Sequence, residues 1–529
     1  IVSIELRPYQ QAAVDAVLHE WDIGHNKTLL VLPTGCGKTI CFAKIAESQV
    51  RVGNRVLILA HRGELLEQAA DKIAKATGLK CAVEKAEQTA LQSWYRITVG
   101  SVQTLMREKR LSQFSPDYYD TIIIDEAHYS ISDSYQNVLN YFSNARVLGV
   151  TATPDRSDMR NLGQIYDSLA YEYKLPQAIK AGYLAQIVAQ TIPLQLDIAH
   201  VGMAAGDYKV SELGTALEPY LDKIAEEMVT YAKDRKTVVF LPLVETSKKF
   251  CRYLRKYGFK AAEVNGNSQD RAEVLKDFED GKYDVLCNSM LLTEGWDCPS
   301  VDCIIVLRAT KSRALYSQMV GRGTRLHEGK ENVLLLDFLW NTERHELCRP
   351  AHLISKDEDI AKKMTEKLEE ATGPIDIEEL EKESESDVIA EREQALAEKL
   401  KEMKKRKRKL VDPLQFEMSI QSEDLSGYVP SFGYEMAPPS VKQIQALEKF
   451  GIFADEIENA GKASLLLDRL KKRQDMSLSR PKQIRFLESR GFQHVGTWTF
   501  DQASSMIARI SMNNWRIPNG VTPETYIPA

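Results

Sequence analysis

The segment LLVLPTGCGKTI contains residue types that suit the binding of phosphate groups. Gly35 and Gly37 let backbone N–H groups approach phosphate oxygens. Lys38 can neutralise the phosphate charge, and Thr39 can hold Mg²⁺. The general phosphate-loop pattern also asks for a glycine where this chain has Leu32. Taken alone, the segment fits either a nucleotide site or a chance Gly-Lys-Thr sequence.

A second segment, TIIIDEAH, places two carboxylates at the end of an apolar run. Asp125 can hold Mg²⁺ beside bound phosphates, and Glu126 can orient or deprotonate an attacking water. The alternative, two solvated loop carboxylates, does not explain why the preceding run is wholly apolar. The two segments together predict an enzyme that binds ATP with Mg²⁺ and hydrolyses it.

The elements that must position these residues follow from the pattern of apolar runs. Residues 1–340 alternate short apolar runs, such as RVLILA and VLLLDF, with helix-like stretches, such as ELLEQAADKIAKA. This alternation is typical of parallel sheets with helices on both faces. The apolar runs are too many for one compact nucleotide domain, and the region near 185–235 lacks strong strand signals. We therefore predict two α/β lobes, residues 1–190 and 191–345.

The rest of the chain divides into three parts. Residues 346–411 are rich in charged helix formers and predict a long solvated helix, followed by a linker at 412–439. Residues 440–529 contain a repeat, VKQIQALEKFGI and PKQIRFLESRGF, which predicts two small helical modules. The basic run KKRKRK at 404–409 is either a nucleic-acid clamp or a solvated helix end, with a targeting signal as a third interpretation.

The composition limits the class of protein. The 529-residue chain has a formal net charge of −6, so no overall basic field indicates nucleic acid, and any polyanion site must be local. Eight cysteines without a C-x-x-C pair exclude paired zinc-ligand spacing and suit a reduced, cytoplasmic protein. No apolar run reaches transmembrane length, so we expect no membrane partner.

The order of the motifs resembles that of the superfamily 2 DEAD/DEAH-box helicases over residues 5–340. In that family the phosphate loop has the form T-G-x-G-K-T, which tolerates Leu32. The segment QMVGRGTR resembles the sixth motif of the family, whose arginines face the γ-phosphate across a cleft. The resemblance implies an α/β fold with two tandem RecA-like parallel-sheet lobes, followed here by a long charged helix and a small α-helical C-terminal region.

The resemblance also implies which residues form the ATP site. The residues expected to bind ATP are Arg7, Gln10, Thr34, Gly35, Cys36, Gly37, Lys38, Thr39, Gly295 and Asp297. The residues expected to take part in catalysis are Lys38, Asp125, Glu126, His128, Gln318, Arg322 and Arg325. Thr39 and Asp125 are expected to hold Mg²⁺. For His128 the resemblance implies coupling between the ATP site and the sixth motif rather than proton transfer.

Further segments resemble the strand-binding motifs of the family: LAHRGELLEQ and TVGSVQTL in the first lobe, and VVFLPLVETS and EVNGNSQDR in the second. LLTEGWDCPSVD resembles the fifth motif, in which Thr293 is directed toward the nucleic-acid backbone. The nucleic-acid contacts that this resemblance implies are Arg62, Gly100, Ser101, Gln103, Asn265, Gly266 and Thr293. Contacts of this kind hold the phosphodiester backbone, so binding is expected to be sequence-tolerant and salt-dependent. For His61, a packing role stays open.

The fifth and sixth motifs are similar to those of bacterial and phage enzymes related to type III restriction Res subunits, XPB-like proteins and RadD-like helicases. This resemblance implies an ATP-dependent helicase or translocase on single-stranded, forked or duplex DNA, in repair, replication or recombination. Three alternatives stay open: a non-unwinding translocase subunit of a restriction or defence complex, an RNA helicase, and a nucleotide-switched DNA-binding protein. A protein partner for the C-terminal repeat is a further expectation.

Overall fold

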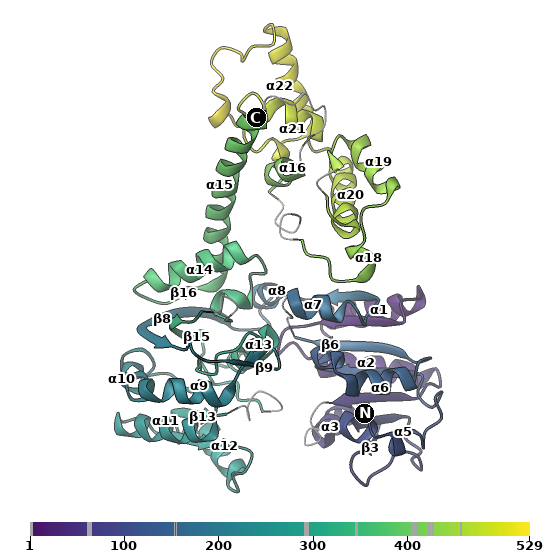
Figure 1. Cartoon of the computed structure of the whole chain (residues 1–529), viewed down its shortest axis with the longest axis vertical. Helices are drawn as coiled ribbons and strands as arrows, with labels where there is room; N and C mark the ends of the chain where they lie inside the picture. Colours follow the sequence, from purple (N-terminus) through teal and green to yellow (C-terminus); the bar gives the residue numbers. More distant parts are fainter. Residues whose placement is uncertain are drawn as a thin grey trace. The chain divides into compact units, whose positions relative to one another are not determined.

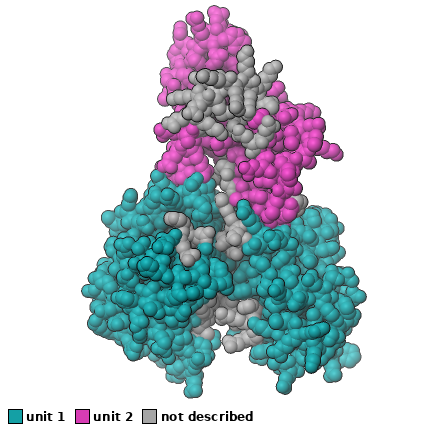
Figure 2. Space-filling model, viewed as in Figure 1, with its two compact units in different colours: residues 1–382 teal, residues 383–529 magenta. Residues whose placement is uncertain are grey.

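The structure is a computed structural model of the chain, and it divides into two compact units, Ile1–Lys382 and Glu383–Ala529 (Figure 2). The residues that it describes are 4–60, 66–152, 154, 156–289, 296–343, 347–403, 411, 413–421, 425, 428–454 and 457–529. Within these ranges the first unit holds two seven-stranded sheets, and the second is helical (Figure 1). No helix in the described part of the chain combines the length and apolar character needed to cross a membrane.

The first sheet has the strand order β3-β4-β2-β5-β6-β1-β7, and all neighbouring strands are parallel. Its strands are β1 Lys27–Val31, β2 Val56–Ala60, β3 Cys81–Glu84, β4 Ile97–Ser101, β5 Thr121–Asp125, β6 Arg146–Thr151 and β7 Ser168–Glu172. Nearly every residue of β2, β4, β5 and β6 is buried, as expected for strands that are covered on both faces.

The helices of this first lobe precede β1 or follow one of the lobe's strands along the chain. They are α1 Pro8–Asp22, α2 Lys38–Arg51, α3 Leu66–Thr77, α4 Val102–Leu105, α5 Glu108–Leu111, η2 Ala127–Ile131, α6 Asp133–Tyr141, α7 Arg156–Leu162 and α8 Leu175–Lys180. Pro8 stands in the first turn of α1, where the missing N–H costs no helical hydrogen bond. Helix α2 buries Cys41, Phe42 and Ile45 on one face, so the element that follows the phosphate-loop segment is anchored in the core.

The second sheet has the order β12-β13-β11-β14-β15-β8-β16, and its strands are parallel except for β16 beside β8. Its strands are β8 Gln186–Asp197, β11 Thr237–Phe240, β12 Ala261–Val264, β13 Val285–Asn288, β14 Cys303–Val306, β15 Asn332–Asn341 and β16 Ile375–Asp376. Beside it lie a hairpin and helices: β9 Met203–Ala204, β10 Asp207–Tyr208, α9 Val210–Leu217, η3 Glu218–Tyr220, α10 Leu221–Tyr231, α11 Val244–Lys256, α12 Arg271–Glu279, α13 Arg313–Gly321 and η5 Pro350–Leu353. The two sheets confirm the predicted pair of RecA-like lobes.

Strand β8 lies in the region near 185–235, where the sequence has no strong strand signal. It spans twelve residues and pairs with β15. Pro193 interrupts the strand pattern in the sequence, because proline cannot donate a ladder hydrogen bond. The register between β8 and β15 shifts after the pair of Ile192 with Phe338, so Pro193 lies in an irregular position of the ladder. The irregularity accommodates the residue that hides the strand in the sequence.

The charged extension is not one continuous solvated helix. Its elements are α14 Glu358–Glu370, β16 and α15 Ile377–Met403. The break between the helices contains Pro374, which cannot continue a helical hydrogen-bond ladder. Ile377, Leu380 and Val388 of α15 are buried at spacings that place them on one helical face. The basic run at 404–409 lies outside the described residues.

The second unit contains the predicted repeat as two helix pairs. Its elements are α16 Pro413–Ser419, α18 Gly433–Met436, α19 Val441–Phe450, α20 Ala460–Asp475, α21 Pro481–Glu488, η7 Val495–Thr497, α22 Phe500–Met512 and η8 Pro523–Thr525. In the first pair, the side-chain amide of Gln443 donates to the carbonyl of Ala460 at 3.0 Å and to the hydroxyl of Ser464 at 2.8 Å. Gln483 makes the matching two bonds at the equivalent positions of the second pair. The sequence repeat is therefore also a repeat of internal contacts.

The segment expected as a linker, 412–439, contributes to the core of this unit. Phe416 in α16 is fully buried among the side chains of the repeat. Gln415 and Ser419 donate hydrogen bonds to the carboxylate of Glu488 in α21. Burial raises the pKa of Glu488 to about 7, although these two hydrogen bonds act in the opposite direction. A short helix in a stretch rich in proline, serine and glycine has little sequence signal, which is why it was missed.

Gly149 in β6 lies against the fully buried ring of Tyr166, and a Cβ at this glycine would come within 2.5 Å of the phenol oxygen. We expect Gly149→Ala to destabilise the first unit by about 1–3 kcal/mol, because a buried ring would have to shift. A thermal melt of the purified variant measures the effect. Gly373→Ala is the matched control, since a Cβ there meets nothing within 4 Å. A Gly149→Ala protein that melts together with the wild type would contradict the close packing.

Candidate nucleotide site

The loop between β1 and α2 forms the centre of the candidate site. Gly35 and Gly37 have φ angles of 92° and 77°, in the left-handed region that favours glycine. A Cβ at Gly37 would lie 2.5 Å from the side-chain nitrogen of Gln10, so glycine is required here for space as well. The loop leads into the first turn of α2, a 14-residue helix whose N-terminus favours anionic groups.

Leu32 occupies the position where the general phosphate-loop pattern has a glycine. Its side chain is fully buried, and its N–H donates to the carbonyl of Thr151 at 3.1 Å, which continues the pairing of β1 with β6. Leu32 therefore belongs to the strand and fills the core, while Gly35 and Gly37 shape the loop.

The first turn of α1 holds this loop by its backbone. The hydroxyl of Tyr9 and the side-chain amide of Gln10 both donate to the carbonyl of Cys36, at 2.8 and 3.1 Å. The side-chain oxygen of Gln10 accepts a hydrogen bond from the N–H of Arg7 at 2.9 Å. Cys36 is buried, and burial raises the pKa of its thiol to about 11, so the thiol stays neutral and packs.

Three tyrosines and Arg7 form a stacked group next to this contact. The rings of Tyr9 and Tyr173 are parallel within 2°, with centroids 4.3 Å apart. The ring centroids of Tyr183 and Tyr9 are 5.1 Å apart, and the guanidinium carbon of Arg7 is 4.8 Å from the centre of the Tyr183 ring. Tyr173 and Tyr183 were not predicted, because they follow the last strand of the first lobe and lie in none of the motifs. The stack keeps Arg7 and Gln10 beside the loop.

Lys38 and Glu126 form a partly buried ion pair, with 3.0 Å between Nζ and Oε1. Burial of Glu126 raises the pKa of its carboxyl, but the charges of Lys38 and His128 oppose this effect, and the net pKa is lowered. Hydrogen bonds from Lys38 and Gln318 add to the lowering. Glu126 has a φ of 56°, an uncommon left-handed conformation that turns the chain away from the end of β5. The pair brings the first two motifs of the sequence together.

His128 lies between the second motif and Thr151, which begins the segment TATP at 151–154. In the family that the sequence resembles, this segment links hydrolysis to movement of the lobes. The Nδ1 atom of His128 is 3.6 Å from Oε2 of Glu126 and 3.5 Å from the hydroxyl of Thr151. Its ring centroid is 4.2 Å from that of Tyr129. The imidazole therefore touches two predicted motifs, a position from which it can respond to the charge of Glu126.

Arg325 of the second lobe reaches the loop of the first lobe. Its Nη1 donates to the carbonyl of Gly35 at 2.8 Å, and its Nε lies 3.3 Å from Oδ1 of Asp297. Nearby, a Cβ at Gly321 would come within 2.5 Å of the Cβ of Thr34, so the two lobes are in direct contact at this point. Residues predicted for the first and sixth motifs thus meet in the structure.

Gln318 and Arg322 stand on and just after α13. The side chain of Gln318 is buried, and its hydrogen bond to Glu126 is among the causes that lower the pKa of that carboxyl. Arg322 donates from its guanidinium group to the backbone carbonyl of Trp296, the neighbour of Asp297. The sixth motif therefore contacts the second motif of the first lobe and the fifth motif of its own lobe.

Lys330 is a residue of the site that the sequence motifs did not indicate. Its ammonium group donates to three backbone carbonyls, those of Pro299, Gly323 and Arg325. Two of these acceptors belong to the turn that carries Arg325, and the third follows Asp297 by two positions. Lys330 thus ties the fifth motif to the sixth and fixes the backbone from which Arg325 extends.

Thr39 and Asp125 are chemically suited to hold Mg²⁺. They supply a hydroxyl and a carboxylate oxygen, the hard donors that this ion prefers. Thr39 lies in the first turn of α2, and Asp125 is the last residue of β5. One carboxylate oxygen of Asp125 also accepts the N–H of Glu126 at 3.0 Å, which orients the side chain.

Three of the residues predicted to contact nucleic acid are buried and pack or hydrogen-bond within their own lobe. Gly100 and Ser101 are buried at the end of β4, and a Cβ at Gly100 would come within 2.9 Å of the side chain of Leu105. Asn265 is buried after β12, and its side-chain oxygen accepts the N–H of Asn267 at 2.9 Å. These residues shape loops at the carboxyl ends of strands.

The remaining predicted contacts differ in accessibility. Gln103 and Gly266 are exposed, each shortly after the carboxyl end of a strand. Arg62 and Thr293 lie outside the described residues. The same holds for His61 and for Gly295, which was predicted to bind ATP.

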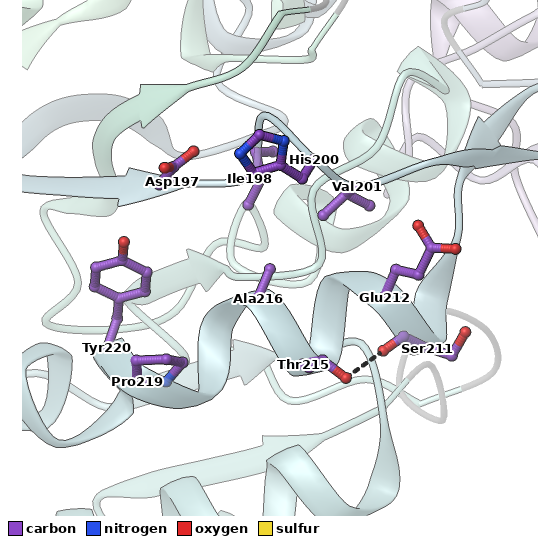
Figure 3. A pocket seen from close by; sticks show the side chains of 10 residues that line it. All are labelled: Asp197, Ile198, His200, Val201, Ser211, Glu212, Thr215, Ala216, Pro219 and Tyr220. Carbon is purple, nitrogen blue, oxygen red and sulfur yellow. Dashed lines mark hydrogen bonds between the residues drawn. The ribbon is translucent and has the colours of Figure 1, made fainter.

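A separate cavity of about 610 Å³ lies in the second lobe, between the end of β8 and helix α9 (Figure 3). It is lined by Asp197, Ile198, His200, Val201, Ser211, Glu212, Thr215, Ala216, Pro219 and Tyr220. None of the predicted ATP-site residues is part of this lining. The two carboxylates, one imidazole and several apolar groups indicate no single class of ligand, so we assign the cavity no role.

Two family models match the chain, one in each lobe. Residues 3–156 match the model described as "Type III restriction enzyme, res subunit". Residues 220–327 match the model described as "Helicase conserved C-terminal domain". The first range includes the loop of Gly35, and the second includes Arg325.

Similar proteins match the same region. A candidate ATP-dependent helicase of Saccharomyces cerevisiae, IRC3, is 30% identical over 67% of this chain and 54% of its own length. The DNA 3'-5' translocase XPB2 of Sulfurisphaera tokodaii is 26% identical over 66% of this chain and 84% of its own length. A solved fragment of a candidate HsdR subunit of a type I restriction enzyme from Vibrio vulnificus is 27% identical, with a TM-score of 0.50 over 63% of this chain and 64% of its own. The chain spans about half the length of the yeast relative.

The partly buried position of Lys330 leads to a prediction about stability and pH. Burial lowers the pKa of this ammonium group from 10.5 to about 8, although Asp302, Cys298 and Asp297 oppose the shift. Between these two values the unfolded chain binds more protons than the folded one, so the stability contributed at this site rises with pH. We expect the melting temperature of the wild type, relative to that of Lys330→Met, to increase between about pH 7 and about pH 9.5.

The control for this comparison is Lys471→Met, a change of an exposed lysine. Its melting temperature relative to the wild type should be the same at both pH values, because a solvated ammonium group keeps its surroundings on unfolding. A Lys330→Met difference that does not change with pH would contradict the burial of this charge.

Proposed function

We propose that this chain, a superfamily 2 helicase of the type III restriction Res-like kind, works as an ATP-dependent DNA helicase or translocase. The observation that carries the proposal is the hydrogen bond from Arg325 of one lobe to Gly35 in the loop of the other. A nucleotide held by that loop would contact both lobes at once. Its binding and hydrolysis can therefore change how the lobes meet, which is how such enzymes move on a strand.

Lys38 is proposed to bind the terminal phosphates of ATP. Its ammonium group is paired with Glu126 in the structure, and a polyphosphate, with its larger negative charge, would compete for it. The charge of Lys38 is also a main cause that lowers the pKa of Glu126. When phosphates neutralise Lys38, the pKa of Glu126 rises, and its carboxylate becomes a stronger base for the attacking water.

The second lobe is proposed to complete the site. Arg325 and Arg322 supply guanidinium groups that can stabilise the charge that develops on the transferred phosphoryl group. Gln318 and His128 both face Glu126, so they can transmit its change of charge to α13 and to the segment TATP. Mg²⁺, held by Thr39 and Asp125, would neutralise part of the phosphate charge.

DNA is the proposed polynucleotide, since the relatives named above include a DNA translocase and a restriction-enzyme subunit. Gln103 and Gly266, one in each lobe, are accessible positions where a phosphodiester backbone can be held. We further propose a role in repair, replication or recombination and a cytoplasmic location. All eight cysteines are free, which suits a reducing compartment.

Two substitutions separate nucleotide binding from hydrolysis. Lys38→Ala and Glu126→Gln should each lower the ATPase rate by about 100-fold or more, because the first removes a phosphate-binding charge and the second removes the base. Only Glu126→Gln should still bind ATP tightly, since it keeps Lys38. Steady-state hydrolysis and equilibrium binding of a fluorescent ATP analogue measure the two properties.

The matched control is Glu226→Gln, a change of an exposed glutamate on α10, which should retain the wild-type rate. Normal hydrolysis by Lys38→Ala would show that the loop is not the nucleotide site.

The choice of polynucleotide is tested by ATP hydrolysis with no nucleic acid, single-stranded DNA, duplex DNA, forked DNA and RNA. We expect the largest stimulation with a DNA substrate, and a loss of stimulation as salt rises, because the contacts are with phosphates. A strand-displacement assay on the best activator then distinguishes unwinding from translocation alone. Stimulation by RNA and by no DNA would overturn the DNA assignment.

A further inference from the structure

The second repeat of the C-terminal unit carries an aromatic and cationic cluster with an exposed edge. The rings of Phe486 and Trp515 meet edge to face, with centroids 6.0 Å apart and planes at 75°. The guanidinium carbon of Arg490 lies 5.0 Å from the centre of the Phe486 ring. The same guanidinium donates to the backbone carbonyl of Trp515. Arg490 therefore connects the helix pair to the chain that follows α22.

The side chains at the outer edge of this cluster are open to solvent. Trp515 is 55% exposed, Met512 is 87% exposed, and Arg516 is exposed as well. The exposure of Trp515 next to a cationic side chain distinguishes this edge from the buried aromatic groups of the same unit, such as Trp498.

The backbone that presents Trp515 is strained. Asn514 and Trp515 have φ angles of 55° and 62°, two consecutive left-handed residues that are not glycine. The N–H of Trp515 donates to the carbonyl of Ile510 at 2.9 Å, and the side chain of Asn513 donates to the carbonyl of Arg516 at 3.2 Å. Strain of this kind costs about 1–3 kcal/mol per residue and is retained where a side chain must be held in one position.

The first repeat serves as an internal comparison, because the two repeats share their helix pairs and the contacts of Gln443 and Gln483. When the repeats are aligned so that Gln443 pairs with Gln483, Phe486 and Arg490 correspond to Ala446 and Phe450. Trp515 and Arg516 correspond to Asp475 and Met476. The first repeat keeps its helix pair without the cluster. Phe486 also packs against the core of the second unit, so the part of the cluster that packing does not explain is its exposed edge, Trp515 and Arg516.

The charge of residues 441–529 favours a negatively charged partner. Residues 441–529 contain 13 Lys and Arg but nine Asp and Glu, in a chain whose formal net charge is −6. A positive module with an exposed aromatic ring suits a polyanion that offers flat faces. A single strand offers its bases for stacking, whereas a duplex keeps its bases inside the helix.

We propose that the cluster of Phe486, Arg490, Trp515 and Arg516 is a binding site for single-stranded nucleic acid, separate from the motor lobes. Trp515 stacks on a base, and Arg516 binds the neighbouring phosphate. Phe486 and Arg490 hold Trp515 in place. The inference rests on the proposed function only in taking DNA as the polynucleotide; the site itself requires no ATP hydrolysis.

The test uses the full chain and a fluorescein-labelled oligothymidylate of about 20 nucleotides, with affinity measured by anisotropy without nucleotide. We expect Trp515→Ala to weaken binding by roughly 5- to 150-fold, the range that follows from the loss of one stacked base. Trp515→Phe should restore most of the affinity. Arg516→Glu is a second variant, and it should weaken binding even if Trp515→Ala fails to fold, because the side chain of Arg516 is exposed. Met476→Ala, in the first repeat, should bind like the wild type.

Photo-crosslinking locates the contact, because the motor lobes also bind DNA under the proposed function. An oligonucleotide with 5-iodouracil is irradiated with the Lys38→Ala protein, and the attached peptide is identified by mass spectrometry. A crosslink at or beside Trp515 supports the site. Crosslinks confined to residues before 383, with unchanged affinity of Trp515→Ala and Arg516→Glu, would overturn it and would favour a protein partner for the repeat.

The two proposals fail in different ways. If DNA does not stimulate ATP hydrolysis but Trp515 crosslinks to the oligonucleotide, the binding site at Trp515 is supported and the proposed DNA helicase or translocase function is overturned. If DNA stimulates hydrolysis but the Trp515→Ala and Arg516→Glu proteins bind normally, the binding site at Trp515 is overturned and the proposed function is supported.

Discussion

The hydrogen bond between Arg325 and the carbonyl of Gly35 is the contact on which the arrangement of the first unit depends. It joins a side chain from the turn after α13 in the second lobe to the loop that follows β1 in the first lobe. Thr34 and Gly321 are in contact beside it, at a distance that leaves no room for a side chain at Gly321. Arg325 and Gly35 both belong to the candidate site. A change in the loop of Gly35 therefore alters the contact between the lobes.

The buried charges around Glu126 impose a second constraint. A carboxylate in a buried position must keep its partners, because an unpaired buried charge costs about 3–5 kcal/mol. Here Lys38 and His128 supply charge from one side, and Gln318 supplies a hydrogen bond from the other lobe. Under the proposed function, a phosphate that takes Lys38 away leaves the Glu126 carboxylate with His128 and Gln318 as its neighbours, so a change at the phosphate can reach α13.

In the C-terminal unit, the contacts that hold the helix pairs together are distinct from the exposed groups at Trp515. Gln443 and Gln483 make equivalent contacts, and these hold the helix pairs together. The strained turn at Trp515 occurs in the second repeat without a counterpart in the residues at the same offset in the first. A repeat of this kind lets one copy maintain the fold while the other acquires exposed groups, because the core positions are shared and the surface positions are not.

The sequence alone determined the features that depend on neighbouring residues. The glycines before Lys38, the carboxylates after an apolar run and the repeat are local patterns, since the backbone geometry within a few residues decides whether they work. The alternation of apolar runs and helix-like stretches determined the two α/β lobes for the same reason. Only the tertiary structure showed that Tyr173 stacks on Tyr9, that Lys330 binds three carbonyls and that a register shift admits Pro193 to a strand. These contacts join residues from different elements, and their energy depends on the path of the chain in space, which no local pattern records.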